Sequence, residues 1–360
     1  MAASHRLQLA LNCTVQLFGR WSVSAIINDP ALDGPRDLDV VELWAGVGAV
    51  AAAASARGLE ARTFDICHGP DEDITTSSGF VKAVRLVLQL KKNGLLAMAP
   101  VCSSFVFPPS SVTRRNKDNF AGNPLVQCVR DGNLMANIAV LLLSVAVARG
   151  ATAFIENPAG SMIFSYLGTN LSRLSWLSTG YADRCAYVTK KMKLAQSWKK
   201  TFKFVATDKW IVKAMRRCRC SESTRHAPLM DRDEAGNVNG RPLDLAKSGS
   251  YPPELGRALV AAWQAWRAQL EMPLQLSSCP SSTAPAIQKL TRKKPRAQEQ
   301  DDDWALVEDK ENAPVSKRTR KIKQAASGVE RDDDFWHPLE EQCSSPAVRQ
   351  IVCSDSDFLA

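Results

Sequence analysis

Short apolar runs alternate with longer helical patterns between Asp37 and Leu270, and this alternation constrains the fold more than any other feature of the chain. The runs typical of buried strands are Val40–Trp44, Ala61–Ile66, Leu95–Ala99 and Ala151–Ile155. Between them, apolar residues recur at helical spacing over Val50–Arg57, Phe80–Lys92 and Asn133–Arg149. Strands that alternate with helices predict an α/β fold, with a doubly wound and mostly parallel sheet.

Length and composition narrow the class of protein. A chain of 360 residues can hold one large α/β domain with additions and can bury a core. No unbroken apolar run approaches the roughly 20 residues of a membrane span, so we expect a soluble protein. Ten cysteines without the pattern of a disulfide framework favour a reducing compartment and mostly free thiols.

The net charge of +9 is concentrated in the body of the chain. Residues 276–360 carry 13 Lys+Arg and 15 Asp+Glu, which leaves 33 basic and 22 acidic residues in 1–275. The basic excess in 1–275 suits a polyanionic partner such as nucleic acid, and solubility alone also explains a moderate excess.

These patterns divide the chain into four segments. We expect an N-terminal extension over 1–37, the α/β domain over 38–190 and 247–270, a small basic insertion over 191–246, and a disordered tail over 277–360. The tail is rich in Ser, Pro, Lys and Asp and shows no periodicity, which is typical of disorder.

A glycine-containing turn follows the first predicted strand, in the sequence Glu42-Leu43-Trp44-Ala45-Gly46-Val47-Gly48. Gly46 and Gly48 would let the backbone approach a ligand closely, because a Cβ there would collide with it. Asp65 closes the next strand and Asp73 lies in the loop beyond it, where carboxylates can accept hydrogen bonds from ribose hydroxyls. Acceptors in consecutive strand-end loops predict a nucleoside-type cofactor across the carboxyl ends of the strands. Each residue alone is also typical of an ordinary turn or cap.

Candidate catalytic side chains follow the next two strands. Cys102, in Ala99-Pro100-Val101-Cys102-Ser103-Ser104-Phe105, lies in a strand-end loop accessible enough for a nucleophile. Glu156, in Glu156-Asn157-Pro158, would lie at the end of the neighbouring strand. A glutamate there could hydrogen-bond N3 of a pyrimidine and make its carbon 6 electrophilic. A lone cysteine is more often a buried apolar residue, and the glutamate could merely cap a turn.

The ordered series ELWAGVG, FDI, EDIT, APVCSSF and FIENPAG resembles the DNA C5-cytosine methyltransferase family over roughly residues 38–262. The resemblance implies a sheet of the S-adenosylmethionine-dependent methyltransferase type and methyl transfer to carbon 5 of cytosine in DNA. It assigns Cys102 as the nucleophile, with Glu156 and Asn157 as its catalytic partners. Tyr251-Pro252-Pro253-Glu254-Leu255-Gly256-Arg257 resembles the family's last segment, whose helix returns to the cofactor pocket. The residues it places around S-adenosylmethionine are Glu42, Trp44 (adenine), Gly46 and Gly48 (methionine end), Asp65 (ribose), Asp73 (adenine amino group) and Pro100.

The sequence also departs from the family's motifs. Val101, Ser103 and Pro158 replace a proline, a glutamine and a valine of the catalytic loops, and Ala49 replaces the third glycine of the cofactor turn. The family's QxRxR segment has no clean copy, and Thr189-Lys190-Lys191-Met192-Lys193 is the nearest candidate.

Three alternatives are considered beside the DNA enzyme. One is a catalytically inactive relative that binds nucleic acid or chromatin as a scaffold. Another is an RNA cytosine methyltransferase, although the second cysteine of the RNA-specific family is absent from the Glu156 loop. An amino-methyltransferase would need an Asn/Asp-Pro-Pro-aromatic loop, which Ala99-Pro100-Val101-Cys102 does not supply.

Residues 190–225 predict a nucleic-acid contact. Twelve Lys and Arg face only Asp208 and Glu222, with Trp198 and Trp210 interleaved, and the tryptophans could stack on bases or form a small core. The candidate contact residues are Lys190, Lys191, Lys193, Lys199, Lys200, Arg216, Arg217 and Arg219. Cys218-Arg219-Cys220 with His226, and Cys185 as a fourth member, could ligate zinc, but the spacing fits no common structural pattern and we predict no metal.

Signals at the two ends suggest location and partners. The basic clusters Arg292–Arg296 and Lys317–Lys323 favour nuclear import, with nucleic-acid contact or a solvated charge run as alternatives. The first 28 residues contain Arg6 and Arg20 but no acid, a mild resemblance to an organelle transit peptide. Two acidic-aromatic pieces, Asp301–Trp304 and Asp332–Trp336, suggest protein docking or chance in a biased tail.

Overall fold

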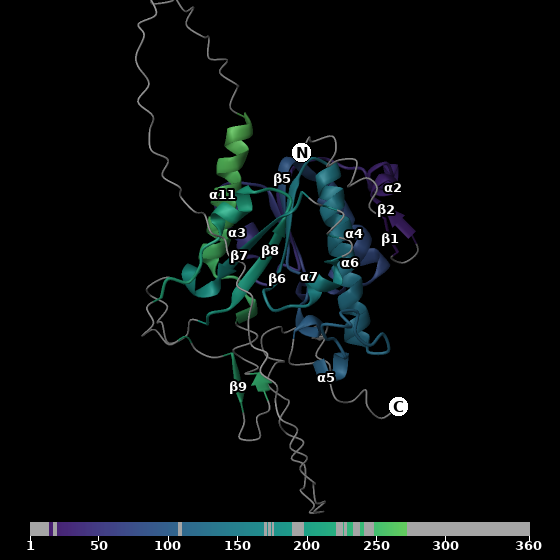
Figure 1. Ribbon diagram of the computed structural model, residues 1–360. Helices are drawn as coiled ribbons and strands as arrows, with labels where there is room; N and C mark the ends of the chain where they lie inside the picture. Colours follow the sequence, from purple (N-terminus) through teal and green to yellow (C-terminus); the bar gives the residue numbers. More distant parts are fainter. Residues whose placement is uncertain are drawn as a thin grey trace, which may run out of the picture. The chain divides into compact units, whose positions relative to one another are not determined.

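A six-stranded sheet organises the protein (Figure 1). The structure is a computed structural model that describes residues 14–16, 20–106, 110–168, 171, 174, 176–188, 198–220, 226, 229–232, 238–240 and 248–271. All of them belong to the first of the chain's two compact units, 1–273 with 342–360; the second is 274–341. The expectations for the tail, its basic clusters and its acidic-aromatic pieces, and for Arg6, Lys190, Lys191 and Lys193, lie outside the described residues.

The strands of the sheet run in the order β4-β3-β5-β6-β8-β7. β3 is parallel to β4 and β5, β5 is parallel to β6, and β8 is antiparallel to both of its neighbours, β6 and β7. The α/β fold with a doubly wound, mostly parallel sheet that the sequence predicts is therefore confirmed. The strand bounds are β3 Leu38–Leu43, β4 Ala61–Phe64, β5 Leu90–Met98, β6 Thr152–Pro158, β7 Ser178–Asp183 and β8 Thr201–Ala206.

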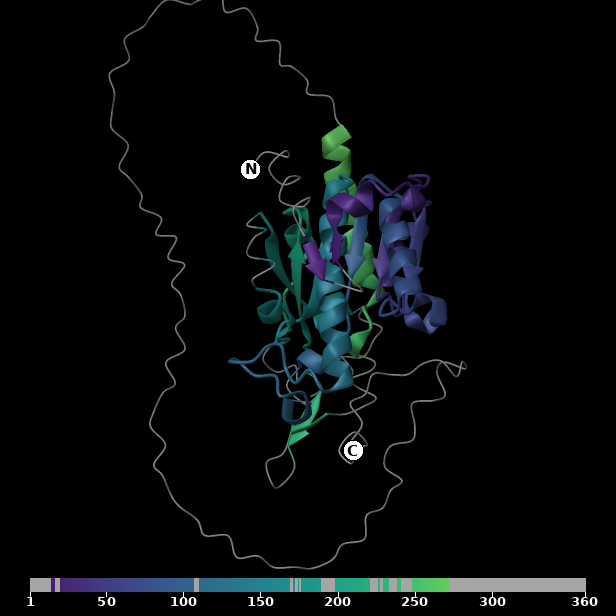
Figure 2. The ribbon, with the colours of Figure 1, turned by 90° about the vertical axis from the view of Figure 1, so that its right-hand side faces the viewer.

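Helices cover both faces of the sheet (Figures 1 and 2). One face carries α3 (Ala49–Ser55), α9 (Trp210–Ala214) and α11 (Pro253–Glu271). Figure 2 looks onto the other face, with α4 (Ser77–Leu88) and α6 (Gln127–Ala148). The remaining elements are α2 Val23–Ile27, α5 Ser110–Thr113, α7 Ile163–Tyr166, the 3-10 helices η1 Pro30–Leu32, η2 Ile66–His68, η3 Pro70–Glu72, η4 Ser103–Phe105 and η5 Arg184–Tyr187, and two small hairpins, β1 Thr14–Gln16 with β2 Arg20–Ser22 and β9 Met230–Arg232 with β10 Val238–Gly240.

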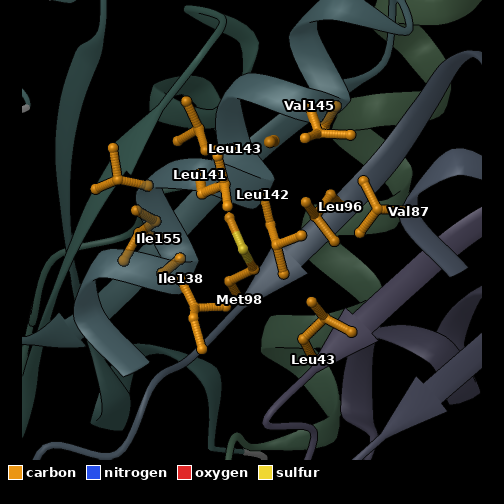
Figure 3. Close-up of a cluster of buried hydrophobic side chains, with 14 of the residues drawn as sticks. Leu43, Val87, Leu96, Met98, Ile138, Leu141, Leu142, Leu143, Val145 and Ile155 are labelled. Atoms are coloured by element: carbon orange, nitrogen blue, oxygen red, sulfur yellow. The ribbon is translucent and has the colours of Figure 1, made fainter. Parts of the chain in front are cut away.

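The larger core lies between the sheet and the α4/α6 layer. Its side chains include Leu43, Leu96, Met98, Leu142 and Ile155, which gather in Figure 3. Within the described part of the chain, α6 is the one helix long and apolar enough to cross a membrane, with a mean hydropathy of 1.6. Most of that stretch is buried inside the protein, which is typical of the core helix of an α/β domain.

The structure corrects the extent of the basic insertion. Thr201–Ala206, which the sequence places in a separate small module, is β8 and pairs with β6 and β7 of the main sheet. α9 packs in the same core as α11. The sheet therefore continues through a stretch assigned to the insertion, because antiparallel pairing with a distant strand leaves no local signal in the sequence.

The strand β5 also begins earlier than expected, at Leu90 rather than Leu95. Its register with β3 is irregular between Leu38 and Val40, and Asn93 has a left-handed φ of 61°. The irregularity conceals the first half of the strand, because its polar residues interrupt the apolar run.

Candidate active site

The turn after β3 has a backbone suited to close approach by a ligand. Trp44, Gly46 and Gly48 have positive φ angles of 53°, 51° and 62°. A Cβ on Gly46 would meet nothing within 4 Å, so open space lies beside this backbone. The indole Nε1 of Trp44 is buried and has no hydrogen-bond partner. An unpartnered donor beside open backbone fits a polar cofactor at this turn.

Acidic side chains fix the shape of the turn. The carboxylate of Asp65 accepts the Gly46 N–H at 2.8 Å and the Cys67 N–H at 2.9 Å. Each carboxylate oxygen can accept a second hydrogen bond, so Asp65 keeps capacity for a ribose hydroxyl. Asp73 lies one turn further on, where its Oδ1 accepts both the N–H and the hydroxyl of Thr75.

Glu42 supports the turn through the start of α3. Its Oε2 accepts the backbone N–H groups of Val50 and Ala51 at 3.0 and 2.8 Å, which caps the start of α3. Burial and, to a smaller extent, the nearby Asp65 raise the pKa of Glu42 to about 7, although those two hydrogen bonds lower it. The described hydrogen bonds of Glu42 go to α3, so the structure shows it supporting the turn, and its contact with the cofactor stays a prediction.

A cavity of about 420 Å³ opens beside the same turn, on the side of α3 and β4. Gly46, Val47, Gly48, Thr63 and His68 are among the residues that line it. Cys102 and Glu156 are not, so the cavity does not mark the predicted site of chemistry. We therefore define the site by the side chains that converge at the strand ends.

Those side chains are Cys102, Glu156 and Asn157, and the structure brings them together. Cys102 follows β5 and directly precedes η4, while Glu156 and Asn157 lie near the end of the adjacent parallel strand β6. The side-chain amide of Asn157 donates to the Pro100 carbonyl at 2.7 Å, which joins the two loops. The Pro100 carbonyl therefore links the Cys102 loop to the end of β6.

Burial and two nearby charges set the pKa of the Cys102 thiol. The side chain is partly exposed, but burial raises its pKa above the ordinary value and the negative charge of Glu156 raises it further. The ammonium of Lys200 acts in the opposite direction and lowers the pKa. Lys200, which the sequence predicts as a nucleic-acid contact, thus also favours the thiolate that a nucleophile requires.

Glu156 has the properties of a proton donor near neutral pH. Its side chain is 5% exposed, and burial raises its pKa to about 7, although the Tyr251 hydroxyl and Lys200 both lower it. The Tyr251 hydroxyl donates to Oε2 at 2.7 Å, whereas Oε1 has no partner. Asn157 Oδ1 is likewise buried and unpartnered. Two unpartnered buried oxygens beside a thiol indicate a site that awaits polar groups of a ligand.

The returning segment 251–257 reaches the site as the resemblance implies. Tyr251 contacts Glu156, and α11 packs directly on the start of α3. A Cβ on Gly256 would lie 2.2 Å from the Ala49 carbonyl oxygen, so only glycine permits this approach. The supporting role of Tyr251 was missed because 95 residues separate it from Glu156 in the sequence.

Arg115 was also missed, and it anchors the Cys102 loop. Its guanidinium donates to Ser104 Oγ at 3.3 Å, to Asn133 Oδ1 at 3.0 Å, and to the Phe120 carbonyl. It also stacks 3.7 Å from the centre of the Phe105 ring. Burial lowers the pKa of Arg115 to about 10. The Arg115 side chain is 1% exposed. Its hydrogen bonds and its stacking on Phe105 therefore hold the residues that follow Cys102 in place.

Replacing Arg115 with Met should therefore loosen the loop. We expect a loss of about 2–4 kcal/mol in the free energy of unfolding, because buried partners lose a charged donor. Cys102 should also react faster with iodoacetamide. Urea denaturation and timed alkylation measure the two effects, with Arg114→Met at the exposed neighbouring position as the control. Equal stability and equal alkylation rates in the two variants would contradict the anchoring role.

The eight candidate contact residues of the 190–225 segment divide into three groups. Lys190, Lys191 and Lys193 lie outside the described residues, and Lys200 lies near Cys102 and Glu156. Lys199, Arg216, Arg217 and Arg219 are exposed, and Arg217 pairs with Asp183 at 2.9 Å. Trp198 and Trp210 are 7% and 5% exposed, so they form part of the packed interior rather than a stacking surface.

Six of the cysteines lie in the described part of the chain. Cys67, Cys102, Cys185, Cys218 and Cys220 form no disulfide, whereas Cys128 is disulfide-bonded.

Comparison with known proteins gives only distant likenesses. No family model matches the sequence, and no curated protein matches it. Among solved structures, the Entamoeba histolytica methyltransferase EhMeth is 12% identical, with a TM-score of 0.31, over 66% of this chain and 99% of that chain. The S. pombe Dnmt2 methyltransferase is 14% identical, with a TM-score of 0.27, over 52% and 57%. Because the sequence identities and TM-scores are this low, the function has to be argued from the site.

Proposed function

We propose that this protein transfers a methyl group from S-adenosylmethionine to carbon 5 of cytosine in DNA. The observation that carries the proposal is the convergence of Cys102 with Glu156, whose pKa is raised to about 7 and whose Oε1 is unpartnered. A thiol beside a carboxyl group that can hold a proton near neutral pH is the pair needed to add a nucleophile to a pyrimidine.

The residues near the turn after β3 would hold the cofactor. Trp44 would lie against the adenine, Gly46 and Gly48 against the methionine end, and Asp65 and Asp73 at the ribose and the adenine amino group. The open space at Gly46 and the unpartnered Trp44 Nε1 support this placement. When bound, S-adenosylmethionine supplies an electrophilic methyl group on a sulfonium sulfur.

The protein's own groups account for activation of the base. The cytosine leaves its stack, because carbon 6 is shielded within a duplex. The Cys102 thiolate adds to carbon 6 while protonated Glu156 donates its proton to N3 through Oε1, which leaves a neutral enamine whose nucleophilic atom is carbon 5. Once carbon 5 carries the methyl group, its proton is lost to water, the carbon–sulfur bond breaks to restore the thiolate, and N3 returns its proton to Glu156. Lys200 favours the thiolate at the start and at the end of this sequence.

Incubation with labelled S-adenosylmethionine and mixed DNA and RNA, followed by nucleoside analysis, tests the proposal. We expect labelled 5-methylcytosine in the DNA. Label in RNA cytosine alone would favour the RNA methyltransferase. Absence of transfer, with binding of cofactor and nucleic acid retained, would favour the inactive scaffold.

The exposed arginines near the site should bind phosphates. Reversal of Arg216 and Arg219 to Glu should weaken binding to all DNA sequences alike and flatten the dependence of log K on log salt by about two units. Arg217 is left intact because it pairs with Asp183. Fluorescence anisotropy over a salt series measures the effect, against a control with Arg57 and Lys92, which are exposed elsewhere, reversed to Glu. Equal affinity and slope in the two variants would place the nucleic acid on another surface.

The proposed nuclear location rests on the two basic clusters of the tail. A tail-truncated fusion that still concentrates in the nucleus would contradict it.

A further inference from the structure

Four metal-ligand side chains meet at one place outside the catalytic site. They are Cys185 on η5, Cys218 and Cys220 on the segment after α9, and His226. Their sulfur and ring nitrogen atoms all lie within 4.8 Å of one another. Cys185 is buried and the other three are half-buried. The sequence predicts no metal site, whereas the fold brings Cys185 together with three residues that lie 33 to 41 positions further along the chain.

The spacing of the atoms matches one tetrahedral shell. Sulfur atoms about 2.3 Å from a central zinc ion lie about 3.8 Å apart, and a sulfur and an imidazole nitrogen lie about 3.5 Å apart. Cys218 Sγ and His226 Nε2 are 3.6 Å apart. Three thiols with one imidazole form a donor set that suits zinc, and four protein ligands leave no open position for a substrate. Such a closed set is structural rather than catalytic.

The residues on either side of Cys185 hold the Cys218 segment in place. Asp183 Oδ2 accepts the Cys218 N–H at 2.8 Å and the Arg217 Nε–H at 2.9 Å. The Tyr187 hydroxyl accepts the Arg216 N–H at 2.7 Å and donates to the Ala214 carbonyl at 2.8 Å. These hydrogen bonds fix the backbone near Cys185 relative to the backbone at Cys218, which supports a preformed site.

The surrounding charge also suits a metal centre. Zinc bound by three thiolates and a neutral imidazole has a net charge of −1. The exposed cations Lys199, Arg216 and Arg219 lie on the segments that carry or adjoin the ligands. A weakly anionic centre would relieve the repulsion among these side chains.

We propose that Cys185, Cys218, Cys220 and His226 bind one structural zinc ion. The ion would tie the segment after α9 (the basic segment, which carries Arg216 and Arg219) to the edge of the sheet. Binding displaces the three thiol protons to solvent. The site joins η5, which follows the edge strand β7, to the segment that carries Arg216 and Arg219. Loss of zinc should therefore loosen the basic segment while the rest of the sheet stays folded. This proposal does not depend on methyl transfer.

Metal analysis of the full-length protein, purified with reductant and without added metal, tests the proposal. We expect about one zinc per chain, released by a chelator together with three newly titratable thiols. Cobalt substitution should give the intense visible bands of a tetrahedral site and a thiolate-to-metal charge-transfer band. The variants Cys218→Ser and Cys220→Ser should each lose at least tenfold in zinc affinity, whereas Cys67→Ser, at an exposed position, should bind as the wild type does.

The cobalt spectrum of the wild-type protein keeps the test decisive if a cysteine variant fails to fold. Wild-type protein that is folded and reduced but takes up neither zinc nor cobalt would overturn the proposal. Retention of full zinc affinity by a folded Cys218→Ser, Cys220→Ser double variant would also overturn it. So would a disulfide between Cys185 and Cys218, mapped by mass spectrometry in protein isolated from cells with thiols blocked at lysis.

Discussion

Replacement of Cys102 with Ala is expected to lower methyl transfer by at least about a thousandfold, because in the proposed mechanism the Cys102 sulfur forms the covalent bond to carbon 6. Binding of S-adenosylmethionine should change little, since the turn at Trp44 and Gly46 lies after a different strand. A filter assay for transferred label and a calorimetric titration with the cofactor measure the two quantities.

The matched control for this prediction is Cys67→Ala, at another cysteine of the same domain that forms no disulfide. It should transfer label at the wild-type rate. Undiminished transfer by Cys102→Ala would remove Cys102 from the mechanism and with it the proposed chemistry.

Replacement of Glu156 with Gln is expected to reduce transfer by about 10²–10⁴-fold and, at alkaline pH, to stabilise the protein. The first effect follows from loss of the proton that N3 receives. The second follows from the pKa of Glu156, which is raised from 4.5 to about 7 by burial. Between these values the folded protein binds more protons than the unfolded chain, so the free energy of unfolding falls as pH rises. Below pH 4.5 there is no penalty from this group, and above pH 7 it is complete.

The rise to about 7 corresponds to roughly 3 kcal/mol. Because glutamine does not ionise, the stability of Glu156→Gln relative to wild type should increase by about 2 kcal/mol between pH 5 and pH 8. Chemical denaturation at the two pH values measures this change, and any constant effect of the new amide cancels in the comparison. The exposed Glu60→Gln is the control and should show no such change. A pH-independent difference for Glu156→Gln would show that Glu156 is not held protonated.

The parts of the site that follow consecutive strands could be predicted from the sequence, because parallel strands place their carboxyl ends at one edge. The loops of Cys102 and Glu156 are of this kind, and so is the turn at Gly46. Each carries its own local signal, namely an apolar run followed by a polar or glycine-containing loop. Their convergence required only the strand order, which the alternation of strands and helices indicates.

The parts that the sequence did not reveal all depend on contacts between distant segments. Tyr251 reaches Glu156 from the start of α11, and Arg115 reaches the Cys102 loop from an irregular stretch with no recognisable motif. The place of β8 in the main sheet depends on pairing with β6. The four residues proposed to bind zinc come together through the pairing of β7 with β8, which brings η5 next to the segment after α9.

The central claim is that the Cys102 sulfur forms a covalent bond with carbon 6 of cytosine in DNA. It is tested most directly with DNA that carries 5-fluorocytosine, because the fluorine on carbon 5 cannot leave as a proton does, and the adduct therefore persists after methyl transfer. The protein–DNA adduct formed with S-adenosylmethionine is isolated, digested and mapped by mass spectrometry. The account predicts a modified peptide that contains Cys102, with the transferred methyl group on the base, and no adduct with Cys102→Ala. Transfer of methyl to cytosine without an adduct at Cys102, or an adduct at another cysteine, would contradict it.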